Sequence, residues 1–272
     1  MIEHSALSIL LGGFIGAILA LTGAGGGILA VPVLVFGLDL SMAQAAPVGL
    51  LAVGLSAGVG AVLGLRDGVV RYRAAILVAV AGIVVAPLGL YIAQRVPNPP
   101  LALGFSLVLL YVCVRILRKA SVDLLREEIA PRAEVMPCLL NAARGRLRWT
   151  LPCARALAFT GLFSGLLSGL LGVGGGFVIV PALTRCTNLE IKSITATSLA
   201  VIAIVSMGSV TTAALTGTLD WQAGITFGAG SVMGLIGARQ IAHRLAGPRL
   251  QQAFAVVGMV AALMLGGHAL LR

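Results

Sequence analysis

Two glycine runs, each followed by a proline, are the features of this sequence best suited to hold a ligand. They read LTGAGGGILAVPVL (residues 21–34) and LLGVGGGFVIVPAL (residues 170–183). Each glycine destabilises a helix interior by about 1 kcal/mol relative to alanine, and the helix-breaking Pro32 and Pro181 have no backbone N–H to donate. The two motifs therefore predict a helix break inside each of two apolar segments.

A break of this kind exposes backbone N–H groups that no side chain shields. The half-helix that begins at Ile28 or Phe177 directs the positive end of its dipole into the break, which favours an anion. We predict that the anion is bound by Gly25, Gly26, Gly27, Gly174, Gly175 and Gly176. A nucleotide-binding loop is a poor match, because GAGGGI and GVGGGF lack the last glycine of GxGxxG and have no βαβ context. Close helix packing is the better explanation for Gly12, Gly16, Gly161, Gly165 and Gly169.

Hydroxyl and amide side chains add further candidate donors to the anion. Thr197 and Ser198 lie near the start of segment 194–219, which carries the most Ser and Thr residues. The first half offers at most Gln44 and Ser56. The alternative is that Ser and Thr bond back to their own helix. We assign that packing role to the later residues Ser206, Ser209, Thr211 and Thr212.

Residues that hold metals or perform covalent catalysis are sparse. The sequence has 4 cysteines without a CxxC pair, which predicts free thiols, and 3 histidines without neighbouring carboxylates. No HExxH motif or Ser/His/Asp set is recognisable. We therefore expect no metal site, no cofactor and no enzymatic activity.

The composition places the chain in a membrane. Hydrophobic residues make up 59% of the 272 positions, charged residues 10%, and the mean hydropathy is +1.06; soluble domains carry about 25% charged residues. The net charge is +10, and the Lys and Arg residues lie between the apolar segments. The positive-inside rule explains this distribution without a nucleic-acid partner. The expected partners are the lipid bilayer and a small anionic substrate, and both a monomer and a homo-oligomer remain open.

Eight apolar segments position the motifs. They lie at 6–37, 42–65, 74–93, 101–117, 156–184, 194–219, 221–238 and 253–271. Lipid offers the backbone no hydrogen bonds, so an all-α polytopic membrane protein is predicted. Its parts are a first membrane repeat (1–117), a basic cytoplasmic linker (118–155) and a second membrane repeat (156–272).

The two halves are copies of each other. A shift of 149 residues aligns them without a gap and brings Gly25, Gly26, Gly27 and Pro32 onto Gly174, Gly175, Gly176 and Pro181. Paired repeats are typical of secondary transporters, whose binding sites lie where the two halves meet.

The distribution of Lys and Arg favours an inverted relation between the repeats. Eight full crossings would divide the 19 basic residues as 13 against 6. If the first and fifth segments instead fold back at their glycines, only Arg95 and Arg272 lie outside, which leaves 17 of the 19 on the cytoplasmic side. Segment 6–37 would form a helix of about 48 Å in a hydrocarbon core of about 30 Å, which also favours a break or re-entry. Eight tilted crossings are the alternative.

At these residues the chain resembles the sulfite exporter family TauE/SafE. The resemblance covers both halves and rests on GxGGG…VP, present at 23–32 and 172–181, on TATSLAVI (195–202) and on GTLDWQAGITFGAGSVMGLIGARQIAHRL (217–245). It implies export of sulfite or small organosulfur anions such as sulfoacetate across the bacterial inner membrane. In the first half the family's TSL reads VGL (48–50) and its G-x-[LV]-[DR]-[WY] reads GVVRY (68–72), which leaves the substrate open.

The favoured hypothesis is an inner-membrane exporter of a small oxyanion, driven at least partly by the membrane potential. A permease for another small anion or for a metal cation is the alternative, although a cation would require carboxylate, His or Cys ligands inside the membrane. An intramembrane enzyme is the third hypothesis.

Overall fold

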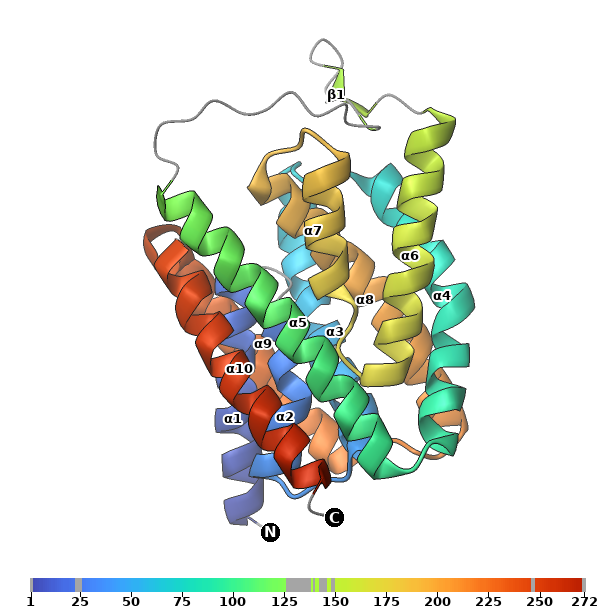
Figure 1. The fold of residues 1–272 in the computed structure, drawn as a ribbon, viewed down its shortest axis with the longest axis vertical. Coiled ribbons are helices and arrows are strands. Elements are labelled where there is room, and N and C mark those ends of the chain that lie inside the picture. Colours follow the sequence, from blue (N-terminus) through green and yellow to red (C-terminus); the bar gives the residue numbers. More distant parts are fainter. Residues whose placement is uncertain are drawn as a thin grey trace.

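The computed structural model describes residues 2–22, 26–125, 138, 140–141, 146–147, 150–245 and 248–270. This part of the chain is almost entirely helical (Figure 1). The exceptions are a two-residue antiparallel ladder, in which β1 (Leu140–Asn141) pairs with β2 (Arg146–Leu147), and an isolated bridge between Cys138 and Thr187.

The helices of the two halves follow the same order. In the first half they are α1 (Ile2–Thr22), the 3-10 helix η1 (Gly26–Leu29), α2 (Ala30–Gly37), α3 (Met42–Arg66), α4 (Tyr72–Arg95) and α5 (Asn98–Leu125). In the second half they are α6 (Leu151–Leu171), α7 (Gly176–Cys186), α8 (Ile191–Leu215), α9 (Trp221–Leu245) and α10 (Pro248–Leu270). Both ends of α6 and of α8 stand 149 positions after those of α1 and α3.

Both long glycine-containing segments are interrupted, and the chain then reverses beside the helix it has just left. A Cβ on Gly26 would collide with the backbone of Leu19, and one on Gly37 with the side chain of Leu11, so α2 runs back along α1. In the same way a Cβ on Gly175 would collide with Ser164. The α1–α2 hairpin lies toward the lower end of Figure 1 and the α6–α7 hairpin reaches the upper end.

Glycine contacts fix how each half packs on the other. A Cβ on Gly12 would collide with the carbonyl oxygen of Phe227 in α9, and one on Gly161 with that of Val78 in α4. Each of these residues stands 149 positions from its counterpart. Without side chains between them, α1 approaches α9, and α6 approaches α4, to backbone contact. The central pair, α3 and α8, is joined by further glycines such as Gly54, which faces Ser206.

The basic side chains gather at one end of the molecule. The Ser193 hydroxyl donates to the Val69 carbonyl oxygen (2.6 Å), and Arg239 pairs with Asp67 (2.8 Å), so the α3–α4 connection, the start of α8 and part of α9 lie together. These contacts place Arg66, Arg71, Arg73, Lys192 and Arg239 at this end. Arg95 lies at the other end, where the neighbouring Gln94 reaches Thr218.

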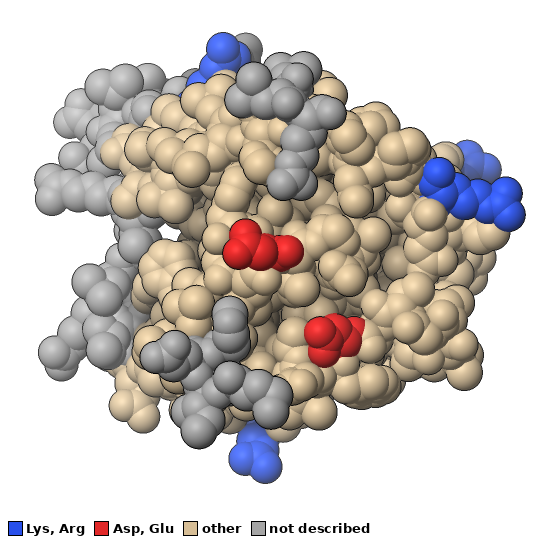
Figure 2. Space-filling model, turned by 90° about the horizontal axis from the view of Figure 1, so that it is seen from below, with Lys and Arg blue, Asp and Glu red and all other residues tan. Residues whose placement is uncertain are grey.

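Both chain termini lie at that second end (Figure 1). Viewed from there, the described surface has acidic groups near its middle and Lys or Arg only at its rim (Figure 2). Six of the described helices are long and apolar enough to cross a membrane. They are α3, α4, the 98–118 part of α5, α6, α8 and the 252–269 part of α10; shorter apolar helices lie at 6–22, 26–37 and 176–186.

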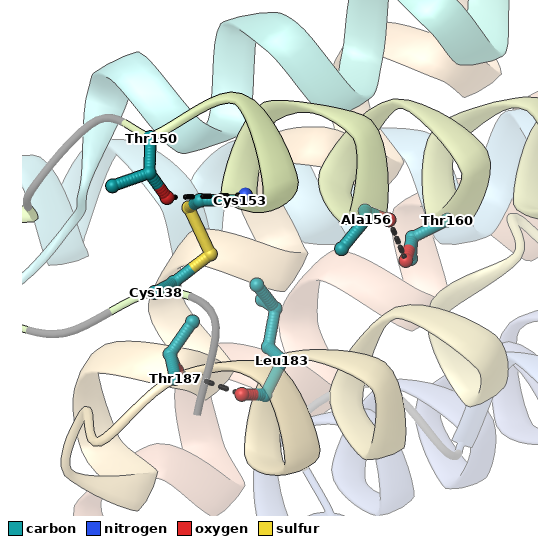
Figure 3. Close-up of a disulfide and its surroundings, with 7 residues drawn as sticks. All are labelled: Cys138, Thr150, Cys153, Ala156, Thr160, Leu183 and Thr187. Carbon is teal, nitrogen blue, oxygen red and sulfur yellow. Dashed lines mark hydrogen bonds between the residues drawn. A yellow bond between two sulfur atoms is a disulfide. The ribbon is translucent and has the colours of Figure 1, made fainter. Parts of the chain in front are cut away.

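Two expectations change in the region between the halves. The linker expected at 118–155 overlaps helix at both ends, because α5 continues to Leu125 and α6 begins at Leu151. The expectation of four free thiols is wrong for Cys138 and Cys153, which form a disulfide beside the end of α7 (Figure 3). Their separation of 15 residues matches no local motif, and only the fold brings their Cα atoms to 5.0 Å. Cys113 and Cys186 are free.

Candidate functional site

The second glycine break depends on a backbone conformation that favours glycine. Gly172, Gly174 and Gly175 have φ values of 72°, 67° and 66°, in the left-handed region that other L-residues seldom adopt. Gly172 ends α6, and Gly175 is the N-cap of α7. The four residues from Val173 to Gly176 are buried.

This conformation leaves backbone donors unused in the protein interior. Within the described chain, the N–H groups of Gly174, Gly175, Gly176 and Phe177 make no hydrogen bond of ordinary length and angle. The Gly175 carbonyl oxygen, by contrast, accepts from Val178 (3.0 Å) and from the Ser164 hydroxyl (3.1 Å). Unpaired buried N–H groups are rare in proteins, and they lie here at the positive end of the α7 dipole.

The first break differs in detail. Gly26 and Gly27 are buried in η1, whereas Gly25 lies outside the described residues. The Gly26 N–H donates to the Thr22 hydroxyl (2.9 Å), which in turn donates to the Ile18 carbonyl oxygen (2.8 Å). This donor therefore has a partner within its own hairpin.

The two breaks meet in the interior. A Cβ on Gly27 would lie 3.0 Å from the carbonyl oxygen of Val173. Val53 of α3 lies between the breaks, within 3.2 Å of that Cβ position and 3.3 Å of the one on Gly174. Of the glycines selected from the sequence, Gly27 and Gly174 are thus brought close to each other.

Both prolines lie inside helices rather than at the breaks. Pro32 is in the first turn of α2, where an N–H would have no intrahelical acceptor, and α7 continues through Pro181. The interruption itself is therefore at the glycines.

The selected polar side chains have partners elsewhere in the protein. The Thr197 hydroxyl accepts from the Arg71 N–H (3.0 Å), and the Ser198 hydroxyl donates to the Ile194 carbonyl oxygen (2.8 Å). Gln44 accepts from the backbone N–H and the hydroxyl of Ser41 at the start of α3. None of these bonds reaches a glycine break.

Two serine hydroxyls in the described chain have no hydrogen-bond partner: that of Ser168, which the sequence did not single out, and that of Ser206, for which the expected bond back to its own helix is not present. The hydroxyls of Ser168 in α6 and Ser206 in α8 are buried and make no hydrogen bond. The Ser206 Oγ lies 3.5 Å from the position that a Cβ on Gly174 would occupy. Ser168 follows Ser164 by four residues and so shares the helix face that Ser164 turns toward Gly175. That spacing was the available signal in the sequence.

A groove of about 490 Å³ lies between α3 and α8. Most of the residues that line this groove are apolar, and they include Gly54 and Ser206. Arg66 is the last residue of α3 that lines it. The groove thus approaches the second break from the side of α8. No group of three His, Cys, Asp or Glu side chains converges anywhere in the described chain.

Comparison with known proteins identifies relatives across nearly the full length. The family model described as "Sulfite exporter TauE/SafE" matches residues 8–265. Two proteins named "Probable membrane transporter protein", from Xylella fastidiosa strains 9a5c and Temecula1, are 31% and 30% identical, each over 82% of this chain and 79% of its own length. No solved structure matches.

Proposed function

The chain belongs to the sulfite exporter TauE/SafE family of membrane transporters, and from this premise we propose that it exports small sulfur-containing oxyanions across the bacterial inner membrane. The substrates proposed are sulfite, sulfoacetate or a related organosulfonate. The observation that carries the proposal is the meeting of two glycine breaks inside an apolar helical bundle.

The two halves are proposed to be inverted repeats. Helix bounds that repeat after 149 residues, and the matched contacts of Gly12 with Phe227 and of Gly161 with Val78, support this relation. The two hairpins would then enter the membrane from opposite sides and place both breaks at its middle, as in other transporters with broken helices. The basic end would face the cytoplasm.

The chemistry of the breaks suits an anion. Sulfite and sulfonates are compact oxyanions, and backbone N–H groups at a helix N-terminus bind such groups without a bulky side chain. Gly25, Gly26, Gly27, Gly174, Gly175 and Gly176 line the proposed site. Thr197, Ser198 and Gln44 remain secondary candidates. Ser198 would have to give up the bond that it donates to Ile194, and the bonds that Thr197 and Gln44 accept hold them at Arg71 and Ser41.

The membrane potential supplies a driving force for export. With the cytoplasm negative, moving one negative charge outward is favourable by about 2.3 kcal/mol per 100 mV. A coupled ion is therefore unnecessary in this proposal.

The test is efflux from liposomes that contain the purified full chain. They are loaded with sulfite or sulfoacetate, and a potential of either sign is imposed with potassium and valinomycin. We expect release to increase when the interior is negative and to fall when it is positive. No flux above that of protein-free liposomes for either anion would refute the proposal, and flux of a divalent cation instead would favour a permease of the other class.

A further inference from the structure

We propose that the direct ligands of the anion lie at the second break alone, where the N–H groups of Gly174–Phe177 and the hydroxyls of Ser168 and Ser206 form one pocket of donors. This inference deepens the proposed function and rests on it. The ligand is a compact oxyanion with several equivalent oxygens, such as sulfite or the sulfonate group of a small organosulfonate.

Unused donors are found on the helices that border this break. The two buried hydroxyls without a partner, Ser168 and Ser206, come from different helices, α6 and α8. Ser206 is fully buried and approaches Gly174, and Ser168 shares a face with Ser164, which binds the Gly175 carbonyl oxygen. A buried hydroxyl or N–H without an acceptor is destabilising, so two hydroxyls and four N–H groups around one helix start indicate a ligand that accepts from them.

The first half has no such set. The positions 149 residues before Ser164, Ser168 and Ser206 are Ile15, Leu19 and Ala57, all fully buried and apolar. In the first break the Gly26 N–H already donates to the Thr22 hydroxyl. The residue of the second half that corresponds to Thr22 is Leu171, which has no hydroxyl. In the first hairpin the Gly26 N–H and the Thr22 hydroxyl therefore bond within the protein. In the second hairpin the hydrogen-bond donors remain available to a ligand.

The first break then has a different role. Gly27 packs on the carbonyl oxygen of Val173, next to the first of the available N–H groups. A side chain at Gly27 would press on the Val173 carbonyl group, so the first half shapes the pocket without supplying its donors. The pocket also adjoins the α3–α8 groove, whose wall includes Ser206.

Alanine substitutions separate binding from folding. We expect Ser206→Ala and Ser168→Ala each to raise the sulfite concentration that gives half-maximal efflux by about tenfold, the effect of losing one hydrogen bond to a charged group. Neither should lower the thermal stability of the anion-free protein, because neither hydroxyl has a protein partner to lose. The matched control is Ser209→Ala in α8, whose hydroxyl already donates to the Val205 carbonyl oxygen (3.3 Å) and which should leave the half-saturating concentration unchanged.

A substitution in the first hairpin completes the test. Thr22→Val removes the acceptor of Gly26 and should lower stability while leaving the half-saturating sulfite concentration unchanged. If wild-type protein transports sulfite, and Ser206→Ala and Ser168→Ala both retain its half-saturating concentration, the one-sided site is wrong and the exporter stands. If wild-type protein shows neither flux nor a sulfite-induced rise in melting temperature, the exporter proposal itself fails.

Discussion

Gly27 of the first glycine break packs directly on Val173 of the second, with only 3.0 Å between a Cβ built on Gly27 and the Val173 carbonyl oxygen. The two residues are far apart in the sequence, and the contact is tighter than the ordinary van der Waals contact of a Cβ atom. A Cβ at position 27 would therefore require the Val173 carbonyl group to shift by a few tenths of an ångström.

The close helix contacts predict which glycines tolerate a methyl group. Gly16→Ala should destabilise the fold by about 1–3 kcal/mol, because the added Cβ would collide with the Ser231 carbonyl oxygen of α9 and force α1 away. Gly13→Ala is the matched control in the same helix, since its Cβ would lie 3.7 Å from the Gly230 carbonyl oxygen, an ordinary contact. Thermal unfolding of the two variants in detergent measures the difference. Equal melting temperatures would show that α1 and α9 are packed differently.

Thr197 provides a test of structural against substrate-binding roles. Thr197→Val removes the acceptor of the Arg71 N–H and should lower the free energy of unfolding by about 1 kcal/mol. Ser198→Ala removes only a bond within α8 and should have a smaller effect. The melting temperature and the half-saturating sulfite concentration are measured for both. A changed half-saturating sulfite concentration with an unchanged melting temperature would indicate that Thr197 binds the substrate.

The disulfide allows the orientation of the chain to be tested. It joins Cys138 to Cys153 at the basic end, which we propose to face the cytoplasm, where stable disulfides are rare. We therefore expect a reversible pair, reduced in growing cells and oxidised after purification in air. Differential alkylation of the cysteines followed by mass spectrometry measures both states. A pair that is fully oxidised inside intact cells would place this end outside the cytoplasm and reverse the proposed direction of each hairpin.

Sequence patterns were informative where one residue type determines the local structure. Three adjacent glycines cannot sustain a long helix, so the interruptions after Thr22 and Leu171 could be predicted without tertiary information. Gly174 and Gly175 adopt positive φ values because glycine has no Cβ atom, which is also why glycine weakens a helix.

The polar part of the site could not be predicted in the same way. Ser198, Ser206 and Ser209 all lie in α8, and two of them bond back to their own helix. Only the approach of Gly174 and Gly54 distinguishes Ser206 from its neighbours. The disulfide was missed for a similar reason, since the fold rather than the spacing of Cys138 and Cys153 makes them neighbours.

Anion flux through variants of the breaks tests the central claim most directly. Leucine at Gly26 would collide with the backbone of Leu19, and leucine at Gly175 would collide with Ser164 and occupy a positive φ. The control is Gly104→Leu on the exposed face of α5, where no atom lies within 4 Å of the added Cβ. Insertion of each variant is checked by membrane fractionation and size-exclusion chromatography before reconstitution. We predict that Gly26→Leu and Gly175→Leu insert normally and lose sulfite efflux while Gly104→Leu retains it; efflux preserved in both break variants would contradict the account.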